Sequence, residues 1–114
     1  AHNMVESYAS SSAHAEMLAM DAAEAVIGSK RLVGCSMYVT LEPCSMCAGA
    51  MVLARIDELF IGTMDPKNGA CGSVLDVTQN GKLNHSVQVE TGIEAQECAE
   101  LLTNFFRELR INKK

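Results

Sequence analysis

The stretch CSMYVTLEPCSMCAGAMVLARIDELFIG, residues 35–62, contains two strand patterns with a helix pattern between them. In residues 35–41 apolar side chains occupy every second position, which is typical of a strand with one buried face. Pro43 stands where a helix can begin, and the small and apolar residues after it continue that helix towards Arg55. Residues 58–61 indicate a second short apolar strand, ended by a glycine. The stretch therefore predicts a strand, a helix and a strand in succession.

A longer helix is expected before this stretch. Residues 13–27 are rich in Ala, Met, Leu and Glu, which are strong helix formers, and Gly28 suits the C-terminal cap. The serines at positions 10–12 lie just ahead and can cap the N-terminus.

Turns dominate the segment that follows. Residues 65–72 hold one proline, one asparagine and two glycines, and Asn80-Gly81 predicts a tight turn. Val87 and Val89 indicate a further strand, and from Gly92 a last helix is expected with one buried stripe. The stripe comprises Ala95, Ala99, Leu102, Phe106 and Leu109. Strands and helices that alternate over 114 residues predict a single α/β domain with helices packed on a sheet.

The amino-acid composition argues against a membrane-spanning protein, a disulfide-rich protein and a general nucleic-acid coat. Hydrophobic residues make up 48% and charged residues 20%, and no apolar run approaches the ~18 residues needed to span a membrane. The five cysteines are an odd number in a chain without secretory features, which favours reduced thiols over a disulfide framework. The net charge of −5 argues against a general nucleic-acid coat. Residues 101–114 nevertheless carry four basic side chains and one acid, which indicates either a local anionic partner or plain solvated surface.

His14, Glu16, Cys44 and Cys47 form the candidate catalytic constellation. His14-Ala15-Glu16 falls at the start of the first expected helix, and Pro43-Cys44-Ser45-Met46-Cys47 at the start of the second. One imidazole and two thiolates suit a tetrahedral zinc ion, and three protein ligands leave a fourth position for water. A carboxylate in the same turn as the histidine can take a proton from that water and return it to a leaving amine. The pattern predicts hydrolytic attack on an amidine-like carbon with loss of ammonia.

A structural zinc site or a redox motif is the alternative reading of the Cys-x-x-Cys pair alone. A closed structural site needs a fourth ligand, for which Cys71, Cys98 and His85 are the candidates. A redox motif leaves the histidine and glutamate at the other helix unexplained.

His-Ala-Glu followed 30 residues later by Pro-Cys-x-x-Cys is the signature of the zinc-dependent deaminases. Within that superfamily the chain resembles the bacterial tRNA-specific adenosine deaminases from Asn3 onward. The matching stretches are residues 40–51 (TLEPCSMCAGAM), residues 65–73 (DPKNGACGS) with Asp76, Gly92-Ile93, and residues 102–107 (LTNFFR).

The resemblance implies conversion of the wobble adenosine of a tRNA anticodon to inosine. It also implies a cytoplasmic homodimer with one catalytic Zn²⁺ per subunit, which binds the anticodon stem-loop and no membrane. The implied RNA contacts are Asn3 at the flipped nucleoside, the backbone amide of Ala15 at the purine edge, Asp65 near the ribose, and Phe106 and Arg107 towards the anticodon loop. Because a flipped base stacks against apolar walls, Leu41 and the residues around Ala48 are expected to line the pocket. For Asp65 the alternative is a turn-capping side chain, and for Phe106 it is core packing.

The implied fold is a three-layer α/β/α cytidine-deaminase-like fold with a mixed central sheet. The family's first helix and first two strands have no counterpart here, so residues 1–114 are read as a single zinc-dependent deaminase domain that is N-terminally incomplete. An exposed sheet edge is expected as a result. Two rival functions remain, a guanine or other free-nucleobase deaminase and a non-catalytic, zinc-stabilised RNA-binding subunit.

Overall fold

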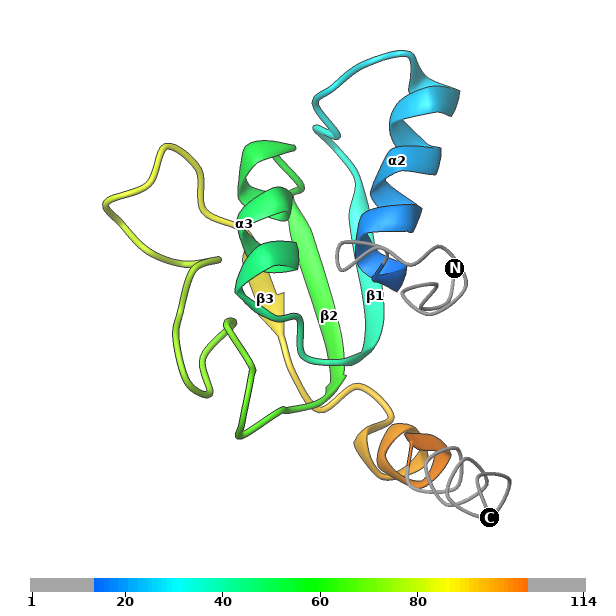
Figure 1. The fold of residues 1–114 in the computed structure, drawn as a ribbon, viewed down its shortest axis with the longest axis vertical. Helices are drawn as coiled ribbons and strands as arrows, with labels where there is room; N and C mark the ends of the chain where they lie inside the picture. The colour runs from blue at the N-terminus through cyan, green and yellow to red at the C-terminus, as the bar shows by residue number, and fades with distance from the viewer. Residues whose placement is uncertain (1–13, 103–114) are drawn as a thin grey trace.

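Three parallel strands form the sheet in the computed structural model, which describes residues 14–102 (Figure 1). They are β1 (Ser36–Leu41), β2 (Glu58–Thr63) and β3 (Gln88–Glu90), and they lie in the order β1-β2-β3. Both strand pairs are parallel, with Val39 opposite Ile61. The predicted α/β class is confirmed, while the mixed character expected of the sheet does not appear within residues 14–102.

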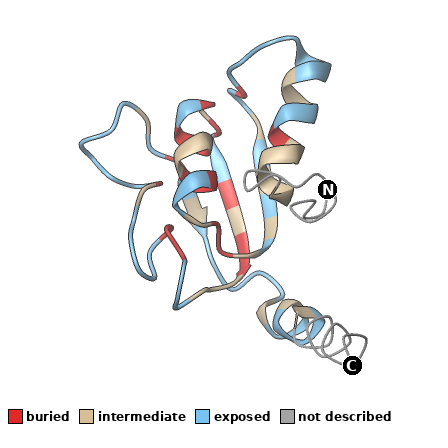
Figure 2. Ribbon diagram, viewed as in Figure 1, coloured by how far each residue is buried: buried red, intermediate tan, exposed pale blue. Residues whose placement is uncertain are grey.

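Two helices cover one face of this sheet. They are α2 (Ala15–Ile27) and α3 (Ser45–Leu53), and in Figure 1 they stand side by side in front of β1 and β2. Because side chains alternate along a strand, Leu59 and Ile61 of β2 point to the same side. Both are fully buried, as is Met51 of α3, and the buried positions concentrate on α3 and β2 in Figure 2. The core therefore lies between β2 and α3.

The opposite face of the sheet is only partly covered within the described residues. Tyr38 of β1 stacks on Phe60 of β2 with ring centroids 4.6 Å apart, and Tyr38 keeps 71% of its surface exposed. Helical residues 95–102 begin the third layer at the end of the strands, where the Cys98 side chain lies directly against Gly62. Within residues 14–102, β1 and β3 are the two edge strands of the sheet.

The first helix starts later than predicted. α2 begins at Ala15 rather than at position 13, and its N-cap is His14, which has extended backbone angles and makes no capping side-chain hydrogen bond. The serines at positions 10–12, which were expected to cap the helix, lie outside the described residues. The C-terminal prediction is confirmed, because Gly28 adopts the left-handed conformation at φ 74° and donates its N–H to the Glu24 carbonyl.

The second helix is shorter than predicted at both ends. The backbone remains extended through Cys44, the N-cap, and the Pro43 carbonyl accepts a hydrogen bond from the Ala70 N–H outside the helix. α3 therefore begins at Ser45, and it ends at Leu53 before a turn with a left-handed residue. Within residues 14–102, no helix combines the length and apolar character required to cross a membrane.

Candidate metal and catalytic centre

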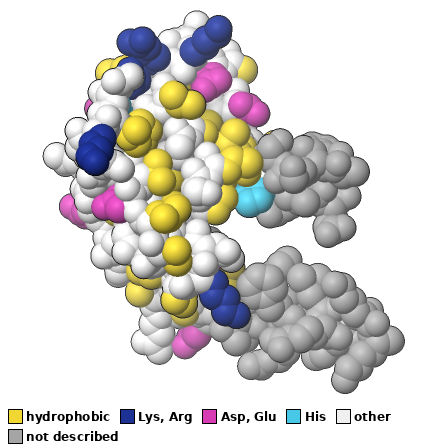
Figure 3. Space-filling view, turned by 60° about the vertical axis from the view of Figure 1, so that its left-hand side comes forward, with side chains coloured by type: hydrophobic (Ala, Val, Ile, Leu, Met, Phe, Trp, Pro, Cys, Tyr) yellow, Lys and Arg dark blue, Asp and Glu magenta, His cyan; other side chains and the backbone are white. Residues whose placement is uncertain are grey.

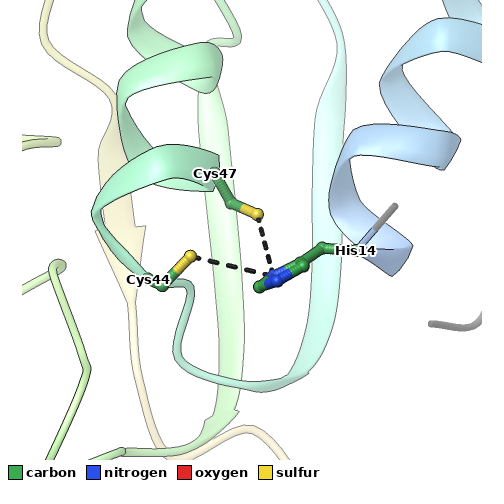
Figure 4. Close-up of side chains that lie close together, drawn as sticks. All are labelled: His14, Cys44 and Cys47. Carbon is green, nitrogen blue, oxygen red and sulfur yellow. Dashed lines mark hydrogen bonds between the residues drawn. The ribbon is translucent and has the colours of Figure 1, made fainter. Parts of the chain in front are cut away.

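The three predicted metal ligands meet between the N-terminal ends of α2 and α3. His14 precedes the first turn of α2, and Cys44 and Cys47 lie at the start of α3, so their side chains point towards one another (Figure 4). His14 Nδ1 lies 3.8 Å from Cys44 Sγ and 3.7 Å from Cys47 Sγ. All three ligand atoms lie within 4.8 Å of one another, so one ion can contact all of them.

The Cys-x-x-Cys spacing explains why both thiols reach the same point. Cys44 is the helix cap and Cys47 lies one turn later, so the two sulfur atoms flank the end of α3. Unpaired N–H groups at a helix N-terminus give that end partial positive charge, which favours a thiolate there. His14 occupies the equivalent place on α2, and two helix ends therefore converge on one site.

Without a cation the site disfavours negative charge on its inner thiol. Burial raises the pKa of Cys47 above the ordinary thiol range, and the nearby Glu16 and Cys44 raise it further. The Cys47 thiol donates a hydrogen bond to Glu16 Oε2 across 3.5 Å. A bound metal ion reverses this preference, because it stabilises the thiolate directly. The electrostatics at Cys47 therefore favour the binding of a cation.

Glu16 lies at the rim of the three ligands. It belongs to the first turn of α2, and its side chain is half-buried. The contact with Cys47 places its carboxylate beside the candidate metal ligands His14, Cys44 and Cys47, hereafter the metal-ligand group. A carboxylate in that position can exchange a proton with a molecule held in the site.

None of the candidate fourth ligands joins this group within the described residues. His85 Nε2 makes a 2.7 Å hydrogen bond with the Ile56 carbonyl, and Cys98 packs on the far face of the sheet against Gly62. Cys71 is buried elsewhere, in the loop after β2. Among residues 14–102 the arrangement is that of an open site with three protein ligands, rather than of a closed structural site.

Glu42 is a buried charged side chain that sequence reasoning missed. It follows β1 directly, is 3% exposed and lies two residues before Cys44. Its Oε1 accepts the Asp65 N–H at 2.9 Å and the Ser73 hydroxyl, while Oε2 accepts the Cys71 N–H at 2.9 Å and the Ser73 N–H at 3.1 Å. Hereafter the Glu42 cradle means this carboxylate with its donors from Asp65, Cys71 and Ser73.

The cradle holds its carboxylate in the charged form. Burial alone raises the pKa of Glu42, but the hydrogen bonds from Ser73, Asp65 and Cys71 outweigh burial and lower it. A glutamate directly before Pro-Cys-x-x-Cys, followed by a glycine-rich loop, was the only signal of this contact in the sequence. The sequence did not indicate that this carboxylate would accept hydrogen bonds from donors 23 to 31 residues further along the chain.

Asp65 caps the turn that it starts. Its Oδ1 accepts the N–H groups of Lys67 at 3.0 Å and Asn68 at 3.2 Å. This is the turn-capping alternative raised by the sequence, and contact of Asp65 with a ribose stays a prediction.

Ala15 and Glu16 also border a hollow of about 240 Å³ beside the open edge of β1. The remaining lining residues are Ala19, Met37, Tyr38, Val39 and Thr40. Ala15 is the first residue of α2, so its N–H is one of those that lack an acceptor inside the helix. Leu41 is half-buried at the end of β1 and does not line the hollow, and its predicted role as a pocket wall stays a prediction.

Three predicted RNA contacts lie outside the described residues, namely Asn3, Phe106 and Arg107. The basic residues of the C-terminal tail lie outside them as well. On the face drawn in Figure 3, the coloured Lys and Arg side chains are scattered around a strip of hydrophobic ones rather than gathered in one group.

Comparison with known sequences assigns the chain to a class of enzymes. The model of the MafB19-like deaminase family matches residues 1–110. The tRNA-specific adenosine deaminase of Bacillus subtilis (strain 168) is 47% identical over 114 residues, which is 100% of this chain and 71% of that protein. The enzyme of the same name from Aquifex aeolicus (strain VF5) is 45% identical over 98% of this chain and 74% of its own length.

Solved structures agree with the fold. A structure from a study of A-to-I editing by tRNA:A34 deaminases at the wobble position of transfer RNA superposes with a TM-score of 0.84 and 38% identity, over 88% of this chain and 72% of that one. Guanine deaminase from Nitrosomonas europaea superposes with a TM-score of 0.75 and 24% identity, over 90% of this chain and 62% of that one. At that identity the second likeness concerns the fold alone.

Proposed function

The chain belongs to the MafB19-like deaminase family, and from this membership we propose that it hydrolyses the wobble adenosine of tRNA to inosine and ammonia. The observation that carries the proposal is the coincidence of two facts. Relatives named for this activity match the chain along its whole length, and the structure brings His14, Cys44, Cys47 and Glu16 to one point.

We propose zinc as the metal, one ion per chain, held by His14, Cys44 and Cys47. In a tetrahedral centre, Zn–N bonds of ~2.0–2.1 Å and Zn–S bonds of ~2.3 Å place nitrogen and sulfur about 3.6 Å apart. The distances from His14 Nδ1 to the two sulfur atoms, 3.7 and 3.8 Å, fit that requirement closely. When bound in such an open site, zinc lowers the pKa of a water molecule so that it becomes a nucleophile near neutral pH.

Glu16 then acts as the proton carrier. Its carboxylate accepts one proton of the water and passes it to N1 of adenine as the oxygen bonds to C6, and it then carries the second proton from that oxygen to the amino nitrogen, which leaves as ammonia. The oxygen remains on the base, so the product is inosine and the carboxylate ends as it began. The half-buried position of Glu16 beside Cys47 supports this role, because it keeps the carboxylate near the donor set without joining it.

The RNA contacts, assembly and location remain proposals of the same kind. We expect Asn3, Ala15, Leu41 and Asp65 to hold the flipped nucleoside, and Phe106 with Arg107 to meet the anticodon loop. We also expect a homodimer that works in the cytoplasm. The relatives named for tRNA support the substrate class, and they bear on none of these finer points.

One assay tests the proposal against its rivals. An RNA anticodon stem-loop with adenosine at the wobble position is incubated with the chain, and nucleosides are analysed for inosine. Inosine at that position is the expected result. Turnover of free guanine with no effect on the RNA would instead identify a nucleobase deaminase, and RNA binding without any turnover would identify a non-catalytic subunit.

A further inference from the structure

Glu42 is the most heavily hydrogen-bonded side chain among the described residues, and the proposed chemistry does not use it. It accepts four hydrogen bonds, three from backbone N–H groups and one from a hydroxyl. Burying a carboxylate is costly unless its oxygen atoms are fully paired. Here no Lys or Arg accompanies the donors within residues 14–102, so the pairing comes almost entirely from one loop.

That loop is folded around the carboxylate. A Cβ added at Gly69 would overlap the Glu42 carboxylate and lie 2.6 Å from the Asp65 carbonyl oxygen, so no side chain fits at that position. Gly69 is buried, and its N–H donates to the Asp65 carbonyl at 3.0 Å. The loop backbone thus closes over the carboxylate, and the contact is built into the loop rather than added at its surface.

The same residues connect the loop to the metal-ligand turn. Glu42 continues the pairing of β1 with β2, because its own N–H donates to the Thr63 carbonyl at 2.9 Å. The next residue, Pro43, accepts the Ala70 N–H at 2.9 Å and is followed by the ligand Cys44. The loop is therefore attached at two adjacent points, one and two residues away from a metal ligand.

The outer side of the loop carries polar groups that face solvent. Pro66, Lys67 and Asn68 are exposed, and the Asp65 carboxylate fixes the backbone of the last two. One side of residues 65–73 is thus locked to the Glu42 cradle, while the other exposes a cation and an amide to solvent, on a loop that is bonded through Ala70 to the residue before Cys44. A fixed surface of donors is suited to a phosphate-containing substrate.

We propose that Glu42 is a positioning residue that fixes residues 65–73 against the metal-ligand turn and thereby sets the affinity for the RNA substrate. It touches no reacting atom, and it acts through the loop. The inference rests on the proposed function, because it assigns the loop to RNA rather than to a free base. It predicts that loosening the cradle weakens RNA binding while the chemical step survives.

Glu42→Gln is the sharpest test, because both carboxylate oxygens accept N–H groups. Whichever way the amide is turned, its NH₂ faces at least one backbone donor, although size and shape are kept. For the stem-loop substrate we expect KM to rise about tenfold or more, which corresponds to ~1.4 kcal/mol. We expect kcat within about threefold of wild type and unchanged metal content, because a positioning role alters binding rather than the transition state.

Two further variants separate positioning from general damage. Gly69→Ala keeps the charge of the carboxylate but forces the loop and the carboxylate apart, so it should raise KM in the same way and gives a second route to the test if Glu42→Gln fails to fold. Glu58→Gln removes an exposed carboxylate on β2 and should leave both KM and kcat unchanged.

Amide hydrogen exchange on the wild-type chain completes the test. The N–H groups of Asp65, Cys71 and Ser73 should be protected like those of β2, and fast exchange there would overturn the proposal. An unchanged KM in folded Glu42→Gln would also overturn it, as would loss of the metal, since the carboxylate would then serve the Cys44 turn alone. If wild type makes no inosine, the proposed function itself fails, and the two failures are thus distinguishable.

Discussion

In the sequence, Pro43 separates Glu42 of the Glu42 cradle from Cys44 of the metal-ligand group. The buried polar side chains of these two clusters are stabilised in opposite ways. In the metal-ligand group, His14 Nδ1 lies close to both cysteine sulfur atoms, and Cys47 donates a hydrogen bond to the Glu16 carboxylate. In the Glu42 cradle, each carboxylate oxygen receives two donors. One cluster is incomplete without an added positive charge, and the other is complete within the chain.

The metal-ligand group is therefore suited to binding a ligand, whereas the Glu42 cradle serves to hold the fold in place. The pKa of Cys47 is raised because the thiol is buried and because Glu16 and Cys44 lie beside it, so a bound cation would stabilise its thiolate. The pKa of Glu42 is lowered because the loop supplies the hydrogen bonds that burial removes. A buried ionisable group therefore indicates a ligand site only when its partners leave it unsatisfied.

The largest effect is expected from removing a metal ligand. Cys44→Ala takes one of two thiolates from the group, and two remaining ligands do not hold zinc tightly. We expect metal content to fall from one ion per chain to nearly none, with no detectable inosine. Elemental analysis of the purified chain, beside the stem-loop assay, measures both.

Cys98→Ala is the matched control, because Cys98 packs against Gly62 on the other face of the sheet. It should keep the metal and the activity. Full metal content in Cys44→Ala would mean that this cysteine is not a ligand.

Glu16→Gln should have the next largest effect. The amide keeps the size of the side chain and its place beside Cys47, but it cannot accept the proton that a carboxylate accepts. We expect turnover to fall by about 10² to 10⁴-fold with metal content unchanged, which is the usual range for loss of general acid–base catalysis. Single-turnover inosine formation at saturating stem-loop measures the loss.

The metal content of Glu16→Gln distinguishes loss of a proton carrier from loss of a metal ligand. If Glu16→Gln also lost the ion, Glu16 would be a ligand and its place outside the group would be wrong. Nearly wild-type turnover would show that another group moves the proton.

The metal-ligand group was predictable from the sequence, whereas the cradle was not. His14, Cys44 and Cys47 stand in a short pattern whose chemistry depends on residue type and local helix position, and both can be read along the chain. The cradle depends on backbone N–H groups that every residue possesses, and folding alone decides which of them converge. The helix boundaries failed for a related reason, since the Pro43 carbonyl is engaged by Ala70 and the chain stays extended to Cys44.

A moderate effect on stability is expected from Ser73→Ala. The hydroxyl is one of four donors to the carboxylate, and hydrogen bonds to charged groups contribute about 1.5–3 kcal/mol each. We expect the free energy of unfolding to fall within that range in a denaturant titration at neutral pH.

Ser36→Ala removes an exposed hydroxyl at the start of β1 and should change stability by less than about 0.5 kcal/mol. Equal stability of the two variants would mean that the three backbone donors satisfy Glu42 without Ser73.

The smallest effect concerns Cys71, whose backbone belongs to the cradle and whose thiol stays outside the metal-ligand group. Burial raises the pKa of this thiol from 9.0 to about 12, with further contributions from the carboxylates of Glu42 and Asp76. The unfolded chain therefore loses the proton at lower pH than the folded chain does. Stability that is present below pH 9 should fall as the pH rises towards 12.

The contribution of Cys71 is isolated by comparing wild type with Cys71→Ala. Between pH 8 and pH 10 we expect wild type to lose about 1 kcal/mol more than the variant, because other alkaline groups titrate equally in both. Denaturant titrations at the two pH values measure this difference. Equal losses of unfolding free energy in the two proteins would mean that the Cys71 thiol ionises at its ordinary pH in the folded chain. The contrast between the Glu42 cradle and the metal-ligand group would then tell us nothing about this third cysteine.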